Sequence, residues 1–309
     1  MNEEAAFRRL SATIDAQRER IEKVGAGPAV ARERASLALE EIRASCALAG
    51  INLDPDELGA LVDRGLALGG RPFREYAVVA GYAAASRLIQ GAEPARGRQL
   101  IRPGEIVDLH ALATHHDERG RPGSWRVTTA VALRSGIVPP PFWLVPREIA
   151  AFARRFGVRP ESDGAPMLFV AKAYAAFTRI HPFTSGNGRV ARLLANLMLR
   201  RLGLPPLIVR QPDVARYRTA LFRADSGDVW PLAVLIARSA LASFSRLEAA
   251  AEPAELRPLS AFARGAARDA LYKAIQRDRL RAVTRGRALF TTGRWIEEYR
   301  RSTGPAGAR

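Results

Sequence analysis

Cysteine is scarce in this sequence, and long apolar runs are missing from it. The 309 residues contain one cysteine, Cys46, which excludes an internal disulfide and any metal site built from several cysteines. No apolar run approaches the roughly 18 residues that a membrane-spanning helix needs. The first residues, MNEEAAFRR, lack the apolar stretch of a signal peptide. We therefore expect a cytoplasmic protein without a membrane segment.

Lysine is also scarce, so the positive charge of the chain is almost entirely arginine. Only three of the 48 basic residues are lysines, and the net charge is +17. A chain rich in arginine and alanine reflects codon composition as readily as function, so the total charge alone says little about partners. Its distribution says more, because residues 257–309 hold 13 basic residues against four acidic ones. This asymmetry favours an anionic partner for the C-terminal segment.

The spacing of apolar residues predicts a mostly α-helical chain. Hydrophobic residues make up 48% of the sequence, which is enough for a packed core. Between residues 30 and 50 they recur every three or four positions, as on one face of a helix, and Gly50 is the expected stop. Comparable patterns predict further helices over residues 54–68, 104–116, 146–156, 165–180, 189–203 and 229–247.

One stretch departs from the helical pattern. Residues 124–141, SWRVTTAVALRSGIVPPP, mix β-branched residues with a Ser135-Gly136 turn and end in three prolines, which predicts a short β-hairpin and then an extended segment. The later segment AAAEPAELRP has the composition of a linker. We expect an N-terminal helical region over residues 1–95, a core over 96–250 and a small basic domain over 258–309.

The segment HPFTSGNGRVARLL, which begins at His181, combines the groups that a polyphosphate site needs. Pro182 disfavours α geometry at His181 and should end the preceding helix there. The two glycines around Asn187 allow backbone N–H groups to converge on an anion where the next helix begins. Arg189 and Arg192 lie on one face of its first turn. A plain turn flanked by solvated arginines is the alternative that this spacing leaves open.

The same segment resembles the signature of the Fic family, H-P-F-x-(D or E)-G-N-G-R-x-x-R. The resemblance covers about residues 35–250, judged by eye: residues 124–141 are similar to the family's active-site flap, and YRTALFRADSGDVWPL to its Y-x-x-A-L region. The resemblance implies a helical Fic-type core with a short β-hairpin flap. The signature is matched at His181, Pro182, Phe183, Gly186, Asn187, Gly188, Arg189 and Arg192.

The resemblance implies a protein adenylyltransferase that moves AMP from ATP to a Ser, Thr or Tyr hydroxyl of a target protein. His181 would deprotonate that hydroxyl, and Mg²⁺ would accompany the nucleotide. The nucleotide-binding residues would be Gly186, Asn187, Gly188, Arg189, Arg192 and Tyr217. The flap residues that pair with the target backbone would be Thr128, Thr129, Ala130, Val131 and Ala132. The target stays unidentified, and a homodimer is left open.

Two departures from the family pattern bear on activity. Ser185 stands where the family has the acidic residue that holds Mg²⁺, and a hydroxyl brings no charge to position that ion. Upstream, SCALAG (Ser45 to Gly50) resembles the inhibitory-helix signature (S or T)-x-x-x-E-(G or N), with Ala49 in place of the glutamate, so residues 30–50 would form a degenerate inhibitory helix. Two consequences are open. Either catalysis is weak or lost, or the site uses another nucleotide, metal or phosphorylated donor. We favour retained nucleotide binding, because the other phosphate-binding residues of the motif are present.

Three further histidines were weighed as metal ligands. His110 falls on an apolar helix face and is expected in the core, whereas His115 and His116 are expected at the surface next to Asp117. A structural zinc site is disfavoured, because neither a fourth ligand nor a motif spacing supports it. Cys46 is expected to be a small buried residue.

Residues 258–309 predict a helix, a hairpin and a second helix, and resemble small winged-helix domains of the excisionase and MerR-like type. In that case duplex DNA is the anionic partner. A solvated basic domain that binds a protein is the alternative. The rival to an enzyme is therefore a DNA-binding regulator with a non-catalytic, nucleotide-binding core. The DNA-contacting residues would be Arg268, Lys273, Arg277 and Arg279 on the recognition helix and Arg285 and Arg287 on the wing.

Overall fold

The computed structural model describes residues 3–25, 27–93, 99–117, 120–130, 136–158 and 165–303. The chain divides into two compact units, the first made of Met1–Ser11 and Ser36–Ser239 and the second of Ala12–Ala35 and Ala240–Arg309. The boundaries predicted near residues 95 and 250 stay predictions. Within the described ranges, no helix has both the length and the apolar character that a bilayer crossing requires.

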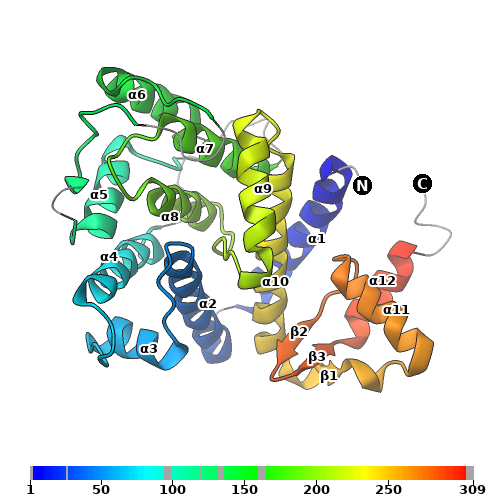
Figure 1. Ribbon diagram of the computed structural model, residues 1–309. Helices are drawn as coiled ribbons and strands as arrows, with labels where there is room; N and C mark the ends of the chain where they lie inside the picture. Colours follow the sequence, from blue (N-terminus) through cyan, green and yellow to red (C-terminus); the bar gives the residue numbers. More distant parts are fainter. Residues whose placement is uncertain are drawn as a thin grey trace. The chain divides into compact units, whose positions relative to one another are not determined.

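Helix α8 (Asn187–Arg201) is the central element of the first unit. It packs against α4 (Phe73–Gln90), α5 (Pro103–Thr114) and α7 (Pro166–Ile180), as Figure 1 shows. Every side chain from Val190 to Leu199 is buried, so α8 is surrounded on all its faces. The predicted mostly helical fold is confirmed, and the motif segment lies at the start of the most enclosed helix.

The other helices are α1 (Glu3–Val24), α2 (Pro28–Ala47), α3 (Pro55–Arg64), α6 (Val145–Phe156), α9 (Val214–Asp225) and α10 (Trp230–Ala251). Their ends follow local chemistry. Helix α3 begins after Asp54, whose side chain accepts a hydrogen bond from Glu57 N at 2.8 Å, with proline at the first helical position. The helix predicted up to Gly50 ends three residues earlier, at Ala47.

The predicted β-hairpin over residues 124–141 is absent as a strand pair from the part of this stretch that the structure describes. Residues 124–130 and 136–141 form no strand, and residues 131–135 lie outside the described ranges. Arg126 gives the physical reason. Its guanidinium donates to Thr128 O at 3.0 Å and to Pro140 O at 2.5 Å. The Thr128 and Pro140 carbonyls therefore accept hydrogen bonds from a side chain instead of from backbone N–H groups of a paired strand.

The second unit contains the small sheet. Helix α11 (Gly265–Gln276) is followed by β2 (Val283–Arg285), β3 (Ala288–Thr291) and α12 (Gly293–Thr303), in the predicted order of helix, hairpin and helix. Strand β1 (Arg257–Pro258) adds to β3, and the antiparallel order is β1-β3-β2. Trp295 on α12 is 1% exposed and lies in the core of this unit with Leu271, Leu280 and Val283.

A buried carboxylate gathers three arginines in the second unit. The Glu248 side chain is 2% exposed; its Oε1 accepts from Arg20 at 2.6 Å and its Oε2 from Arg281 at 2.7 Å, and Arg294 also pairs with it. Arg281 lies over the Trp295 ring at 4.9 Å from its centroid. Burial raises the pKa of Glu248, but the three arginines lower it below its usual value. These arginines are therefore structural.

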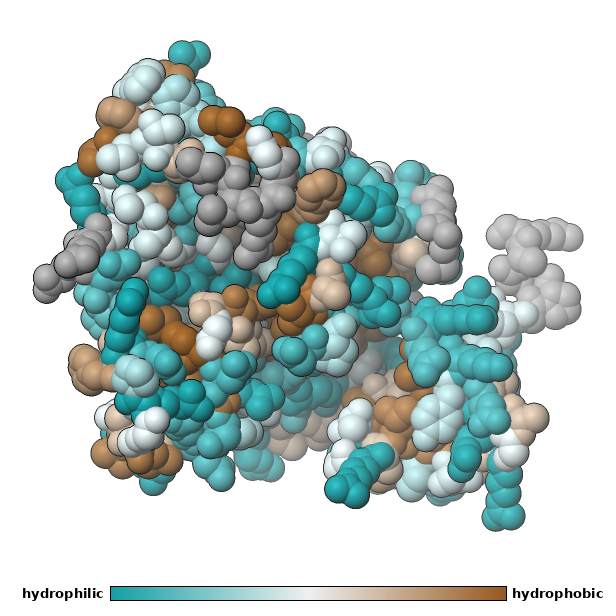
Figure 2. Space-filling view, viewed as in Figure 1, coloured by the Kyte–Doolittle hydropathy of each residue, from teal (hydrophilic) through white to brown (hydrophobic). Residues whose placement is uncertain are grey.

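The surface face seen in Figure 2 is mostly hydrophilic, with hydrophobic side chains in separate patches. The large apolar residues exposed in the described part of the chain include Val138 at 76% and Trp143 at 65%. Trp143 belongs to the short 3₁₀ helix η3 (Phe142–Leu144), directly before α6. Trp143 lies just after residues 124–141, the segment predicted to hold the flap, and Val138 lies within that segment.

Candidate active site

His181 is the first residue after α7 and has a left-handed backbone, with φ 49° and ψ 59°. Pro182 ends the helix at this point, as predicted. The strained conformation is held by His181 N, which donates to Phe177 O at 3.1 Å, and by His181 O, which accepts from Arg126 Nε at 2.8 Å. Burial lowers the pKa of His181, and a backbone hydrogen bond with Thr178 offsets this only in part. The neutral imidazole, which can accept a proton, is therefore favoured.

The loop between His181 and α8 is held by one aromatic ring and one amide. Phe183 is fully buried, and its ring stacks on His110 with centroids 3.6 Å apart and on Trp125 at 5.0 Å. Asn187 Nδ2 donates to Phe183 O at 2.7 Å, and Asn187 Oδ1 accepts from Phe183 N at 2.9 Å. The Asn187 side chain thus braces the loop, and what Asn187 can offer a phosphate is its backbone N–H.

Gly186 and Gly188 form the entry to α8. Gly186 has φ 75°, and a Cβ there would lie 2.6 Å from Thr114 Cγ2, so only glycine fits. Val190 N donates to Gly186 O at 3.0 Å, which leaves the N–H groups before it without acceptors inside the helix. Free N–H groups and the positive end of a helix dipole are the features with which helix N-termini bind phosphates.

Arg189 places a positive charge at this entry. Its Nη1 donates to Ala113 O at 2.7 Å, at the C-terminal end of α5. A Cβ built on Gly186 would lie 3.6 Å from Arg189 Nη2, so the guanidinium lies close to the glycine turn. Burial lowers the pKa of Arg189 below its usual value, yet an arginine keeps its charge in proteins.

Arg192 is 6% exposed and is bonded to the protein on several sides. Its Nε donates to Ser45 Oγ, its Nη2 to Ser45 O at 3.1 Å and its Nη1 to Tyr217 Oη at 3.4 Å. Tyr217 Oη is also hydrogen-bonded to Tyr174 Oη at 2.6 Å. Burial lowers the pKa of Arg192, but the phenols of Tyr217 and Tyr174 raise it above its usual value. A bound nucleotide would have to draw Arg192 away from Ser45.

Of the three residues predicted to form a degenerate inhibitory motif, Ser45 contacts Arg192. Ser45 lies on α2 and is buried, whereas Ala49 and Gly50 are exposed in the turn that follows this helix. Ala49 N donates to Cys46 O and Gly50 N to Ala47 O, both at 2.9 Å. Helix α2 therefore brings a neutral hydroxyl, and no carboxylate at position 49, to the arginine.

Sequence reasoning missed an acidic residue near Arg192. Glu41 lies one turn before Ser45 on α2, is 3% exposed and accepts a hydrogen bond from Tyr82 Oη at 2.6 Å. Burial raises the pKa of Glu41 to about 7, although Tyr82, Arg192 and Asn196 lower it. The spacing of four residues between Glu41 and Ser45 was the available signal, because it places both on one helix face.

His110 fixes the loop from the side of α5. It is buried, as predicted, and its Nδ1 accepts from Gly123 N at 3.0 Å. The proton of the neutral ring therefore sits on Nε2, which donates to Ser185 O at 3.2 Å. Burial lowers the pKa of His110 to about 4, so this tautomer persists at neutral pH. His110 holds the main chain of the motif instead of binding a metal.

Asp117 is hydrogen-bonded to Ser185, the motif residue that departs from the family pattern. Ser185 Oγ donates to Asp117 Oδ2 at 2.8 Å, and Gly120 N donates to Asp117 Oδ1 at 3.0 Å. Burial raises the pKa of Asp117, but the hydrogen bonds from Ser185 and Gly120 lower it below its usual value. Asp117 was considered only with its histidine neighbours; nothing local in the sequence pairs it with a residue 68 positions away.

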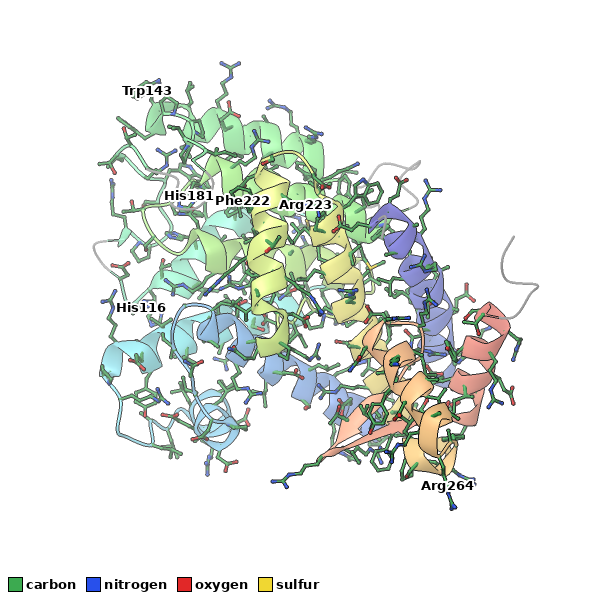
Figure 3. The ribbon with its side chains drawn as sticks, turned by 45° about the vertical axis from the view of Figure 1, so that its right-hand side comes forward. His116, Trp143, His181, Phe222, Arg223 and Arg264 are labelled. Atoms are coloured by element: carbon green, nitrogen blue, oxygen red, sulfur yellow. The ribbon has the colours of Figure 1, made fainter. Side chains whose placement is uncertain are left out.

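The other two histidines lie beyond α5. His115 is exposed and His116 half-buried, and the latter comes from a different element than His181, as Figure 3 shows. Within the described residues, no three histidine, cysteine, aspartate or glutamate side chains gather in a way that could hold a metal ion. Cys46 is buried, and burial raises the pKa of its thiol to about 12.

The predicted flap residues lie mostly at the surface. Thr128 and Thr129 are exposed and Ala130 is half-buried, whereas Val131 and Ala132 lie outside the described residues. Arg126, which the sequence reasoning missed, is 2% exposed and bonds to carbonyls from both the flap and the motif. Burial lowers its pKa. The flap and the histidine are thus anchored by the same side chain.

The six cations predicted to contact DNA are all exposed, but not all lie where they were expected. Helix α11 ends at Gln276, so Arg277 is its cap and Arg279 lies in the following turn instead of on the helix. Asp278, with φ 55°, breaks the helix, and Arg279 N donates back to Ala274 O at 2.9 Å. Arg285 ends β2, and Arg287 lies in the hairpin turn.

The motif segment lies in a part of the chain that matches known proteins. Residues 100–199 match the family described as Fic/DOC family. The protein adenylyltransferase Fic of Nematostella vectensis is 30% identical over 231 residues, which are 73% of this chain and 52% of that protein. The protein adenylyltransferase fic-1 of Caenorhabditis briggsae is 28% identical over 200 residues, which are 65% of this chain and 39% of that protein. The chain thus spans about half or less of the length of these relatives.

Solved structures share the fold. Fic-1 from C. elegans superposes with a TM-score of 0.72 at 24% identity, over 81% of this chain and 74% of that one. A Fic family protein from Desulfovibrio desulfuricans G20 superposes with a TM-score of 0.64 at 19% identity, over 93% of this chain and 95% of that one. The helical arrangement around α8 is therefore that of known Fic structures.

Proposed function

Residues 100–199 form a Fic/DOC family domain, and from this premise we propose that the protein is an adenylyltransferase that moves AMP from ATP to a hydroxyl of a target protein. One observation carries the proposal. A half-buried histidine of lowered pKa stands one short loop before a helix N-terminus with a glycine turn, and arginines lie beside that turn. This places a base next to a polyphosphate site.

The reaction that fits this arrangement is an in-line substitution at the α-phosphorus. The target hydroxyl gives its proton to the His181 imidazole while its oxygen bonds to the α-phosphorus. The bond from that phosphorus to the bridging oxygen of the β-phosphate breaks, and pyrophosphate leaves. Lowering of the His181 pKa by burial keeps the imidazole unprotonated before the reaction.

The phosphates would be held at the start of α8. Backbone N–H groups of Gly186, Asn187 and Gly188 would donate to the α- and β-phosphates, with Arg189 beside them. Arg192 would reach the γ-phosphate after leaving Ser45, and Tyr217, its hydrogen-bonding partner, would move or rebond with it. Hydrogen-bond donors and positive charges that are positioned in advance stabilise the negative charge that develops on the phosphates in the transition state. This stabilisation is the main contribution of a protein to such a transfer.

A divalent cation such as Mg²⁺ fits the donor set beside the glycine turn. Ser185 Oγ and the Asp117 carboxylate are hard oxygen donors 2.8 Å apart, and Mg²⁺ is commonly held by one or two carboxylates together with substrate phosphates. When bound, such an ion supplies charge neutralisation of the phosphates. The residues that would hold it are Asp117 and Ser185.

The target protein would bind at the segment before η3. Thr128 and Thr129 are exposed, and because the Thr128 carbonyl is bonded to Arg126, strand addition would use the backbone of Thr129. The exposed apolar side chains of Val127, Val138 and Trp143 lie near these residues in the sequence. Arg126 would keep this surface in register with His181, because it bonds to the carbonyls of both Thr128 and His181.

The test is incubation of the protein with ATP labelled on the α-phosphate and a divalent cation, alone and with cell lysate. We expect label on protein, and none with His181→Ala. Loss of a positioned base lowers a transfer rate by about 10² to 10⁴. ATP binding by calorimetry should persist in His181→Ala. Binding of ATP without label on any protein would instead support a non-catalytic, nucleotide-binding core.

A second function, duplex DNA binding, is proposed for the second unit. Two groups of basic residues in this unit differ in their surroundings. Arg20, Arg281 and Arg294 are consumed by Glu248, whereas the six predicted cations from Arg268 to Arg287 face solvent. Arg264 at the start of α11 also points outward in Figure 3. Exposed arginine on a helix and a hairpin suits phosphate contacts of the winged-helix kind.

DNA binding is tested with the full chain, because the second unit also includes residues 12–35 and 240–256. Fluorescence anisotropy with a labelled duplex should show affinity that falls steeply with salt. Replacing Arg285 and Arg287 by serine should weaken binding and reduce the salt slope by about 2. Replacing exposed Arg300 and Arg301 removes the same charge and serves as the control. Equal weakening by both pairs would indicate non-specific attraction and contradict a wing contact.

A further inference from the structure

The carboxylate missing from the motif is replaced by one from another element. We propose that Asp117, in the loop after α5, is the acidic metal ligand of this site. It takes the role that the family signature gives to the acidic residue at the position of Ser185. The inference rests on the proposed nucleotide site at the start of α8 and assigns it a ligand that the motif does not contain. The ion that Asp117 would hold is a divalent cation that binds together with the phosphates of ATP.

The position of Asp117 carries the proposal. Asp117 Oδ2 lies 2.8 Å from Ser185 Oγ, and Ser185 directly precedes the glycine turn whose N–H groups face the phosphates. An acidic residue at 185 would have its carboxylate at the place of this hydroxyl. The Asp117 oxygen is therefore one hydrogen bond away from the position that the signature prescribes.

The surrounding backbone holds Asp117 in that place. Asp117 N donates to Thr114 O at 2.8 Å, and Gly120 N donates to Asp117 Oδ1 at 3.0 Å. A Cβ on Gly120 would lie 2.5 Å from Ser185 Oγ and 2.6 Å from Asp117 Oδ2, so glycine is needed for the two side chains to meet. On the other side, His110 Nε2 fixes the Ser185 carbonyl at 3.2 Å. Both partners are thus positioned by separate contacts.

The Asp117 carboxylate has lone pairs left for a metal ion that keeps part of its water shell. Each Asp117 side-chain oxygen accepts a hydrogen bond, from Ser185 Oγ or from Gly120 N, and has further lone-pair directions available. His116 Nδ1, on the neighbouring residue, is buried and has no hydrogen-bond partner among the described residues. Mg²⁺ and Mn²⁺ need few protein ligands when phosphates and water complete the shell. One carboxylate and one hydroxyl are enough in that case.

The proposal changes which variant tests the metal ligand. With Ser185 as the lost ligand, restoring an acid by Ser185→Asp should improve the site. With Asp117 in place, Ser185→Asp sets two carboxylates within hydrogen-bonding distance, where like charges repel. A divalent cation between the two carboxylates relieves this repulsion, so Ser185→Asp alone does not tell which carboxylate holds the metal. Ser185→Asp in the Asp117→Asn background does, because that pair moves the carboxylate back to the motif and should restore the metal binding that Asp117→Asn loses.

The experiment measures Mn²⁺ by electron paramagnetic resonance in the presence of ATP, so it does not depend on transfer activity. We expect the wild type to bind Mn²⁺ with ATP, and Asp117→Asn to weaken it at least tenfold. The swap Asp117→Asn with Ser185→Asp should regain most of it. Asp108→Asn, an exposed aspartate on α5, removes the same charge and should match the wild type. Ser185→Ala should keep Mn²⁺, since the carboxylate remains.

The outcomes separate this inference from the function on which it rests. Calorimetry with ATP alone is run on each variant beside the Mn²⁺ measurement. If ATP binds and Asp117→Asn holds Mn²⁺ as tightly as Asp108→Asn, Asp117 is not the ligand and the proposed function stands. If Ser185→Ala loses Mn²⁺ and Asp117→Asn does not, the inference is likewise overturned. If the wild type binds no ATP with or without Mn²⁺, both fall.

Discussion

Arg192 on α8 and Ser45 on α2 are joined twice, by the Arg192 Nε bond to the Ser45 hydroxyl and by the Nη2 bond to the Ser45 carbonyl. The guanidinium proposed for the γ-phosphate is thus held by the helix that resembles an inhibitory element. A serine holds it with neutral oxygens, which a phosphate can outcompete more readily than it can a carboxylate.

Ser45→Ala should tighten ATP binding. The substitution removes one of the two bonds from Ser45 and leaves the carbonyl in place. A hydrogen bond to a charged group contributes about 1.5 to 3 kcal/mol, and part of this is regained at the carbonyl, so we expect about tenfold higher affinity. Calorimetry measures it. Ser226→Ala, whose hydroxyl bonds to its own helix, is the control. Unchanged affinity would mean that Ser45 does not restrain Arg192.

Glu41→Gln should change how stability depends on pH. Burial raises the pKa of Glu41 to about 7 from 4.5. The folded state therefore holds a proton that the unfolded state releases, and the wild type loses stability as pH rises from about 4.5 to 7, by about 3 kcal/mol in total. Glutamine keeps an acceptor for Tyr82 and cannot titrate, so this loss should disappear. Thermal unfolding of both proteins between pH 4.5 and 8 tests it; parallel curves would contradict it.

Gly186→Ala should destabilise the protein more than Gly203→Ala. Both glycines have positive φ, 75° and 72°, so both variants bear the cost of a left-handed alanine, roughly 1 kcal/mol. At Gly186 the new Cβ also meets Thr114 Cγ2 at 2.6 Å, whereas nothing lies within 4 Å at Gly203. We expect an additional loss of about 1 to 3 kcal/mol at Gly186. Denaturant midpoints give the difference, and equal midpoints would rule out the close contact.

Glu248→Gln should destabilise the second unit by about 3 to 5 kcal/mol, because it leaves three arginines without their buried counter-charge. Glu297→Gln removes an exposed charge 3.6 Å from Arg301 and should cost less than about 1 kcal/mol. The pKa of Glu248 is lowered, so its contribution is present above pH 4.5 and is lost as pH falls through the lower folded-state value. Equal unfolding midpoints of the two variants would contradict the role of Glu248.

Short-range chemistry explains what the sequence predicted correctly. Pro182 ends α7, and Gly186 starts α8, because each acts on its own backbone. The helix–hairpin–helix order after residue 264 follows from turn residues in the same way. The end of α11 was misplaced because Asp278 takes a left-handed conformation that its residue type only permits.

Contacts between distant segments explain what was missed. Ser45 and Arg192 are 147 residues apart, and Ser185 and Asp117 are 68 apart. No periodicity or local motif encodes such pairs, since they are set by how α2, α5 and α8 pack. The hairpin over residues 124–141 was predicted from β-branched residues, the Ser135-Gly136 turn and the family resemblance, whereas the Thr128 and Pro140 carbonyls are bonded to Arg126. Side-chain competition for backbone acceptors has no signature in a strand pattern.

Arg126 has a consequence for how freely the chain can change. All four acceptors of its guanidinium are main-chain carbonyls, those of Thr128, Pro140, Ile180 and His181. Every amino acid supplies such a carbonyl, so the side chains at these positions can be exchanged without removing the bonds. Substitutions at Thr128 and Thr129 therefore vary the surface proposed for target binding while the imidazole keeps its backbone anchor.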